Sequence, residues 1–323
     1  MGEMTGPLVV AIDGGGSKTD AVALSLEGAV VARTTGGGSS PHFIGVDASV
    51  KQIDALVRQV AGSATVASAN LYLSGLDFPS EIAAFTTAIA HLNWASATTT
   101  IENDLYALLR AGTSARDAVA VVCGTGINAL GRRADGAVAR FAALGNISGD
   151  WGGGTGIGES ALWHAARHAD SRGRATSLTA AIPGVYGLDT LDEFIHALHV
   201  GDLEYSDLGL LSPVVFAHSD AGDTIARELV DRQGTEVAVM AASCIDRLDL
   251  SRDVVPVVLG GGVIASMHPR LMATIEAELA ARAPFAAIHH VAAPPIVGAA
   301  LLALESAGAG RGAVERARKE LES

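Results

Sequence analysis

The chain has 323 residues, of which 49% are hydrophobic, and it carries a formal net charge of −13. That length accommodates two domains of ordinary size, and the hydrophobic fraction excludes global disorder. No long Lys/Arg block interrupts the acidic composition, so we expect neither nucleic acid nor an anionic membrane as a partner.

The two cysteines, Cys123 and Cys244, form no C-x-x-C motif, which favours buried free thiols in a reducing compartment. The chain begins without a basic segment followed by an apolar one, and its apolar runs are shorter than the roughly 20 residues that span a bilayer. We therefore expect a cytoplasmic protein.

Apolar strands that end in glycine clusters organise the chain. Three such runs occur: Leu8–Ile12 before Gly14–Gly16, Val119–Cys123 before Gly124–Gly126, and Val254–Leu259 before Gly260–Gly262. Returning strands follow the first two clusters at Ala21–Leu26 and Asn128–Gly131. Because the same device appears twice about one domain apart, we predict two related α/β halves, 1–115 and 116–323, facing a cleft. The last helix of the second half can alternatively pack back on the first.

Helical patterns lie between these strands. Apolar residues keep a 3.6-residue period over 50–60 and 271–279, and the region 161–248 reads as mostly helical. The tail 308–323 is small and charged, so we expect it to end as an exposed helix or to fray.

The first glycine cluster is a candidate phosphate loop, formed by Asp13, Gly14, Gly15, Gly16, Ser17, Lys18 and Thr19. Consecutive glycines let the backbone approach an anion and adopt positive φ, so that N–H groups point at phosphate oxygens. Ser17 and Thr19 add hydroxyls, and Lys18 adds a cation if it faces inward. Asp13 can hold a hydrated Mg²⁺ that bridges phosphates. The alternative is a tight hairpin turn with a solvated aspartate.

Two better-known nucleotide motifs do not fit. A Walker A loop needs glycine before its lysine, and here Ser17 precedes Lys18. The segment 124–129 matches a relaxed dinucleotide fingerprint, but that fingerprint needs a helix after the turn, and a second short strand follows instead.

Taken in order, these segments resemble the N-acetylglucosamine kinase branch of the BadF-type ATPases, within the actin-like sugar-kinase superfold. D-G-G-G-S-K-T at 13–19 resembles the first phosphate loop, G-T-G-I-N at 124–128 the second, V-L-G-G-G-V at 258–263 the adenosine segment, and 294–300 a closing helix. The resemblance implies two ribonuclease-H-like domains that bind ATP and Mg²⁺ in the cleft. It implies nucleotide contacts by Gly124, Thr125, Gly126, Gly260, Gly261 and Gly262.

Asp104 is the candidate catalytic base. It follows a strand-like run at Thr98–Glu102 and precedes the helical Tyr106–Arg110, so its side chain belongs at the carboxyl end of a strand. The family resemblance implies that this carboxylate orients the acceptor hydroxyl and takes its proton. The alternative is that Asp104 merely caps the following helix.

The stretch Gly149–Gly154 resembles the G-D-E-G-S segment of the family, in which the aspartate, here Asp150, contacts sugar hydroxyls. Trp151 can stack on a sugar or lie in the core, and the glycines can form a hinge or a close backbone approach. The family's G-G-W-G is replaced by Ala142–Gly145, and its sugar-binding asparagine near residue 41 is missing. Candidate sugar contacts are therefore Asp104, Asn128, Gly145, Asn146, Asp150, Ser40 and His42.

The sequence thus predicts an ATP-dependent kinase that phosphorylates an amino-hexose, N-acetylglucosamine or glucosamine, at the 6-hydroxyl. Another hexose, N-acetylmuramic acid or a cyclitol is the main alternative acceptor. A BadF-type activator ATPase is disfavoured because its cluster cysteines lie close together, whereas Cys123 and Cys244 do not. The family resemblance also implies a homodimer.

Overall fold

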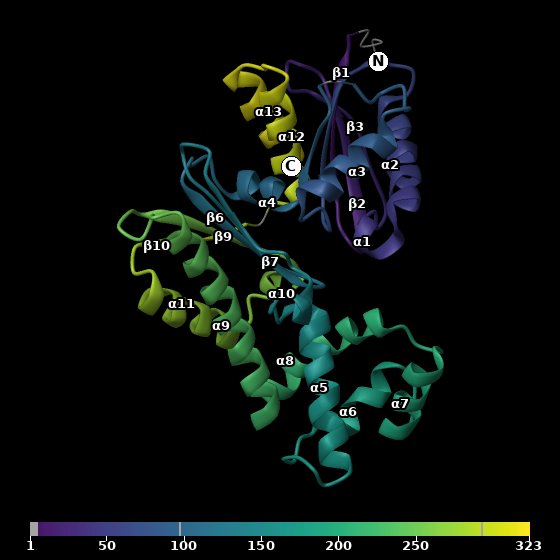
Figure 1. Ribbon diagram of the computed structural model, residues 1–323, viewed down its shortest axis with the longest axis vertical. Helices are drawn as coiled ribbons and strands as arrows, with labels where there is room; N and C mark the ends of the chain where they lie inside the picture. Colours follow the sequence, from purple (N-terminus) through teal and green to yellow (C-terminus); the bar gives the residue numbers. More distant parts are fainter. Residues whose placement is uncertain (1–5, 97, 292) are drawn as a thin grey trace. The chain divides into compact units, whose positions relative to one another are not determined.

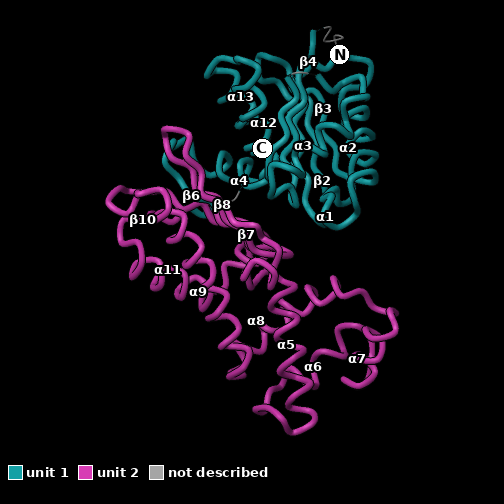
Figure 2. The backbone as a smooth tube through the Cα atoms, in the orientation of Figure 1, with its two compact units in different colours: residues 1–120, 289–323 teal, residues 121–288 magenta. Residues whose placement is uncertain are grey.

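The computed structural model describes residues 6–96, 98–291 and 293–323, and its contacts divide the chain into two compact units (Figures 1 and 2). Unit 1 comprises residues up to 120 together with 289–323, and unit 2 comprises 121–288. The division into domains at 1–115 and 116–323 stays a prediction. Among the described residues, no helix combines the length and the apolarity that crossing a membrane requires.

Unit 1 contains a five-stranded mixed sheet in the order β3-β2-β1-β4-β5. Its strands are β1 (Leu8–Gly14), β2 (Lys18–Leu24), β3 (Val30–Gly37), β4 (Val66–Leu73) and β5 (Thr100–Asn103). β1 pairs antiparallel with β2 and parallel with β4, and β4 pairs parallel with β5. The carboxyl ends of β1, β4 and β5 therefore lie at one edge of the sheet.

Both faces of this sheet are buried, because apolar residues fill successive positions of β1. Leu8, Val10 and Ile12 face a core that α2 and α3 complete. Val9 and Ala11 face a second core that α4, α12 and α13 complete. The helices of unit 1 are α1 (Pro41–Ile44), α2 (Val46–Ala61), α3 (Pro79–Ile89), α4 (Leu105–Gly112), α12 (Pro295–Ser306) and α13 (Arg311–Leu321).

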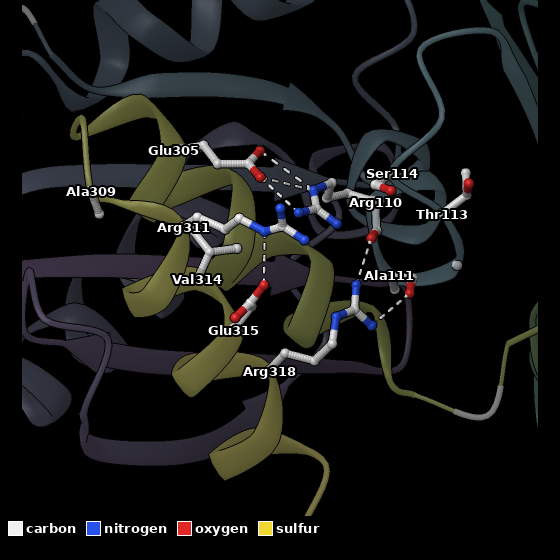
Figure 3. A pocket seen from close by; sticks show the side chains of 11 residues that line it. Arg110, Ala111, Thr113, Ser114, Glu305, Ala309, Arg311, Val314, Glu315 and Arg318 are labelled. Atoms are coloured by element: carbon white, nitrogen blue, oxygen red, sulfur yellow. Dashed lines mark hydrogen bonds and ion pairs between the residues drawn. The ribbon is translucent and has the colours of Figure 1, made fainter.

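The end of the chain thus completes the core of unit 1 and holds α4 in place. A Cβ atom at Gly298 of α12 would lie 1.9 Å from the Ala107 carbonyl oxygen of α4, so the two backbones touch. Arg318 of α13 donates to the carbonyls of Arg110 and Ala111 at the carboxyl end of α4, at 3.2 and 3.1 Å (Figure 3). A guanidinium at this end complements the helix dipole.

Unit 2 is built on a second five-stranded sheet, in the order β10-β9-β6-β7-β8, and on a long helical segment. The strands of this sheet are β6 (Ala118–Cys123), β7 (Ile127–Arg132), β8 (Val138–Arg140), β9 (Val255–Gly260) and β10 (Ala286–His290), and the boundary between the units falls within β6 and β10. The helices of unit 2 are η1 (Gly145–Ile147), α5 (Gly153–Ala169), α6 (Leu178–Val185), α7 (Leu191–Val200), η2 (Tyr205–Leu211), α8 (Ser212–Asp220), α9 (Thr224–Arg247), α10 (Gly262–Ala265) and α11 (Pro269–Arg282). The mostly helical character predicted for 161–248 is confirmed.

Candidate active site

The first glycine cluster forms a tight hairpin turn between β1 and β2. The Gly15 N–H donates to the Lys18 carbonyl at 2.9 Å, and the Gly15 carbonyl accepts from the N–H groups of Ser39 and Ser40 at 3.0 and 3.3 Å. Gly16 and Ser17 are exposed at its tip. These hydrogen bonds fix the base of the turn, while its tip stays exposed to solvent.

The sequence led us to expect positive φ angles at the glycines of this turn, and the structure does not have them. None of Gly14, Gly15 and Gly16 has a φ in the left-handed region. A Cβ at Gly14 would lie 2.4 Å from Ser39 Oγ, and one at Gly16 would lie 2.9 Å from the Phe43 ring. Gly14 and Gly16 are required because neighbouring side chains approach the backbone too closely for a further side chain to fit.

The polar residues of the first loop face in different directions. Lys18 Nζ donates to Asp20 at 2.8 Å, and its side chain is 64% exposed, so this ammonium group is engaged beside the loop. Thr19 is buried, and its hydroxyl donates to the Gly37 carbonyl at 2.8 Å. Thr19 thus supports the turn from within unit 1, whereas Ser17 lies at the exposed tip.

Three carboxylates influence one another at the base of this loop. Burial, and after it the negative charges of Asp104 and Asp20, raise the pKa of Asp13 to about 8, while Lys18 opposes the rise. A carboxylate surrounded in this way is stabilised by a cation, and hard divalent ions such as Mg²⁺ prefer oxygen ligands. The chemistry of this group therefore fits a hydrated Mg²⁺ ion held by Asp13.

Asp104 lies at the N-cap position of α4, directly after β5, but its side chain makes no cap hydrogen bond to the helix. Asn103 does this instead, because its Oδ1 accepts from the Leu105 N–H at 3.1 Å. The alternative that Asp104 serves as the helix cap is therefore wrong.

Asn103 is a functional candidate that the sequence did not single out. It is buried, and its Nδ2 donates to Asp77 Oδ1 at 3.0 Å and to the Leu76 carbonyl at 3.4 Å. It therefore ties the segment after β4 to the start of α4, next to Asp104. An asparagine that immediately precedes a candidate base at a strand end was the available signal.

Ser40 and His42 lie in unit 1 near the same edge of the sheet. Ser40 is buried, and its hydroxyl donates to the Ser74 carbonyl at 3.0 Å, just after β4. A Cβ at Gly75 would lie 2.6 Å from His42 Cβ, which places His42 over the same segment. His42 is exposed and can reach a ligand, whereas the Ser40 hydroxyl is already used.

The second and third glycine clusters come together in unit 2. The Gly124 N–H donates to the Gly126 carbonyl at 2.9 Å, which closes the turn after β6. A Cβ at Gly261 would lie 2.4 Å from the Cys123 carbonyl oxygen, and Gly261 has a φ of 96°, so only glycine fits there. The segments 124–126 and 260–262 therefore form one surface, as a nucleotide site requires.

The candidate sugar segment of unit 2 is a compact, exposed turn. Gly145 and Asn146 begin η1, and the Gly145 carbonyl accepts from the Asp150 N–H at 3.0 Å. Asp150 Oδ2 accepts from the Ser148 hydroxyl. Asn128 lies on β7, where its Oδ1 accepts from the Ala129 N–H at 2.7 Å. The carboxylate of Asp150 is thus oriented by its own turn.

The structure decides how the glycines after Trp151 are used. The guanidinium of Arg232 lies 3.9 Å from the centre of the Trp151 ring, and the indole N–H donates to Ser160 Oγ at 3.0 Å. A Cβ at Gly153 would lie 2.5 Å from Gly126 Cα. The glycines therefore allow a close backbone approach to the second loop.

Comparison with known proteins identifies relatives over most of the chain. Residues 10–303 match the sequence profile of the BadF/BadG/BcrA/BcrD ATPase family. An N-acetyl-D-glucosamine kinase from Dictyostelium discoideum is 29% identical over 318 residues, which cover 94% of this chain and 99% of that protein. An N-acetylmuramic acid/N-acetylglucosamine kinase from Clostridium acetobutylicum is 24% identical over 265 residues, covering 80% of this chain and 86% of that protein.

Solved structures share the fold. A Chromobacterium violaceum protein assigned as an N-acetylglucosamine kinase matches with a TM-score of 0.72 and 21% identity, over 92% of this chain and 99% of that one. A ROK family glucokinase from Streptomyces griseus, solved with glucose and AMPPNP, matches with a TM-score of 0.57 and 16% identity, over 92% and 99%. The predicted α/β fold of the actin-like sugar kinases is confirmed.

Proposed function

This chain belongs to the BadF/BadG/BcrA/BcrD ATPase family, and from that premise we propose that it is an ATP-dependent sugar kinase. Its acceptor is an amino-hexose, N-acetylglucosamine or glucosamine, which it phosphorylates at the 6-hydroxyl. The observation that carries the proposal is the position of Asp104, whose carboxylate follows β5 at the strand edge and whose negative charge helps to raise the pKa of Asp13.

Unit 2 supplies the nucleotide-binding backbone in this proposal. Gly124, Thr125 and Gly126 bind phosphate oxygens, and Gly260–Gly262 contact the adenosine. Backbone N–H groups suit this role because they neutralise an anion without adding a net charge, and the chain as a whole is strongly acidic. Binding by the backbone also explains how a chain of net charge −13 accommodates a triphosphate.

Unit 1 supplies the first phosphate loop and the two reactive carboxylates. Residues 14–17 turn toward phosphate, with Lys18 and Thr19 on the flanking strand, and Asp13 holds Mg²⁺ through water. When bound, Mg²⁺ neutralises charge on the phosphate oxygens. Asp104 orients the acceptor hydroxyl and accepts its proton as the new phosphorus–oxygen bond forms.

Asp150 is the proposed sugar-recognition residue of unit 2. Its carboxylate is oriented by Ser148 and accepts hydrogen bonds from sugar hydroxyls, which are strong because the acceptor is charged. Gly145, Asn146 and Asn128 are the further contacts proposed for the acceptor in unit 2, and His42 is the contact proposed in unit 1.

An ADP-release assay tests the proposal. Purified protein with ATP and Mg²⁺ is assayed with N-acetylglucosamine, glucosamine, N-acetylmuramic acid, N-acetylmannosamine and glucose. We expect the highest kcat/KM with one of the first two sugars, and the product to carry phosphate on the 6-hydroxyl by NMR. ADP release that no sugar stimulates would refute the kinase proposal, whereas preference for another sugar would refute only the acceptor.

The oligomeric state and the compartment are also proposals. We propose a homodimer, as the family resemblance implies, and a cytoplasmic location, as the composition leads us to expect. Sedimentation equilibrium of the purified protein would contradict the dimer if it gave the mass of a single chain at micromolar concentration.

A further inference from the structure

Helix α5 begins without a side-chain cap of its own. The residue at its N-cap position is Gly152, with a φ of 138°, and Gly153 follows with a φ of 72°. Both conformations favour glycine over any residue with a side chain. The Ser, Thr, Asp or Asn that usually accepts hydrogen bonds from the first turn is therefore missing.

A glutamine from another helix supplies the missing acceptor. Gln233 lies on α9, and its Oε1 accepts from the Gly153 N–H at 2.8 Å, although the two residues are 80 positions apart in sequence. Its side chain is 0% exposed, and its Nε2 has no hydrogen-bond partner among the described residues. A buried, half-satisfied amide is unusual, because each buried donor normally finds an acceptor.

The next two N–H groups of α5 bind the second glycine turn. The Gly154 N–H donates to the Gly124 carbonyl at 2.7 Å, and the Thr155 N–H donates to the Thr125 carbonyl at 3.0 Å. The described peptide bonds are all trans, so the C=O and N–H of each peptide unit point in opposite directions. Fixing these two carbonyls on α5 therefore turns the N–H groups of Thr125 and Gly126 away from α5.

Thr125 and Gly126 are exposed, so their N–H groups face the side from which an anion arrives. The position of this turn depends on α5, and the first turn of α5 depends on Gln233. We propose that Gln233 is a positioning residue for the second phosphate loop. The proposal rests on the proposed function, because it assumes that this loop binds phosphate.

The unpaired Nε2 raises the question of why this residue is a glutamine and not a glutamate. A glutamate would keep the acceptor for Gly153, would remove the unpaired donor when ionised and would complement the positive end of the α5 dipole. A glutamate would also place a negative charge two contacts away from the phosphate loop. A neutral acceptor holds the helix without repelling the nucleotide.

Calorimetric titration with Mg²⁺-ADP and, separately, with adenosine tests this role. Gln233→Met removes the acceptor, and Gln233→Glu retains it but adds charge. We expect the Kd for ADP to rise about tenfold or more in Gln233→Met, which is the effect of losing one well-placed hydrogen bond to a charged group, and to rise less in Gln233→Glu, where the loop stays in place and only charge repulsion acts. The Kd for adenosine should stay within about twofold, because adenosine carries no phosphate.

Ile245→Val is the matched control, because it lies on the same helix, is buried and loosens packing away from the loop. It should change neither Kd. Equal weakening of ADP and adenosine, or wild-type ADP affinity in Gln233→Met, would show that Gln233 is only a structural cap and would overturn the proposal. Wild-type protein that binds no Mg²⁺-ADP would instead refute the proposed function, and the inference with it.

Discussion

Replacing Gly298 by alanine should damage the contact through which α12 holds α4. The new Cβ would lie 1.9 Å from the Ala107 carbonyl oxygen and 2.6 Å from the Ala111 nitrogen, and both are backbone atoms. Restoring a carbon–oxygen contact of about 3.3 Å requires the helices to separate by about 1.4 Å. Overpacking usually costs about 1–3 kcal/mol, and the upper end applies here because no flexible side chain can move aside.

A loss of about 3 kcal/mol in a unit of this size lowers Tm by about 6–12 °C. Thermal denaturation followed by circular dichroism measures it, and kcat measured well below that Tm should also fall, because Asp104 lies at the start of α4. Gly312→Ala is the control. Gly312 is exposed on α13, and no other part of the described chain comes within 4 Å of the place its Cβ would take, so the Tm should stay the same or rise slightly. A Gly298→Ala protein with wild-type Tm would refute this account of the α12–α4 contact.

Three further predictions concern titratable groups. Asp104→Asn should keep the wild-type Tm but lose at least about 100-fold in kcat, as expected for loss of a general base; near-normal turnover would exclude Asp104 as the base. Asp13→Asn should raise Tm in the nucleotide-free protein by an amount that grows from pH 5 to pH 8, because only the unfolded wild-type chain releases the Asp13 proton in that range; a pH-independent difference would contradict the raised pKa. Burial raises the pKa of the Cys123 and Cys244 thiols to about 12, so a thiol reagent at pH 8 should modify both only after unfolding in guanidinium; rapid reaction of either in the folded protein would argue against that burial.

Features encoded in short stretches of sequence were predictable. The pattern of apolar strands that end in glycine clusters predicted the positions of all three loops. The pattern of residues 98–110 predicted that Asp104 follows a strand and precedes a helix. The positive φ expected of the first glycines was wrong, because close approach by Ser39 and Phe43 is what excludes a side chain at Gly14 and Gly16. Residues that approach from elsewhere in the chain leave no local signal.

Long-range partners account for most of what the sequence did not reveal. Gln233 acts on Gly153 across 80 residues, and α9 carries no motif that indicates this contact. The tail 308–323 was expected to be exposed or frayed because its residues are small or charged, with packing of the last helix on the N-terminal half as the alternative. Ala317 and Leu321 are nonetheless buried in unit 1, since two apolar residues on one side of a short helix suffice to cover the neighbouring core.

The late position of α12 and α13 has a consequence during synthesis. The sheet of unit 1 is complete once residue 103 has been made, but of the three helices that cover Val9 and Ala11 only α4 follows at once, and α12 and α13 come after residue 294. At about 5–20 residues per second, the ribosome needs roughly 10–40 s to add that remainder. For that time a nascent chain carries an apolar sheet face that only α4 covers, so its yield in the cell should depend on chaperones that shield such surfaces, and loss of residues 294–323 should leave most of that face permanently exposed.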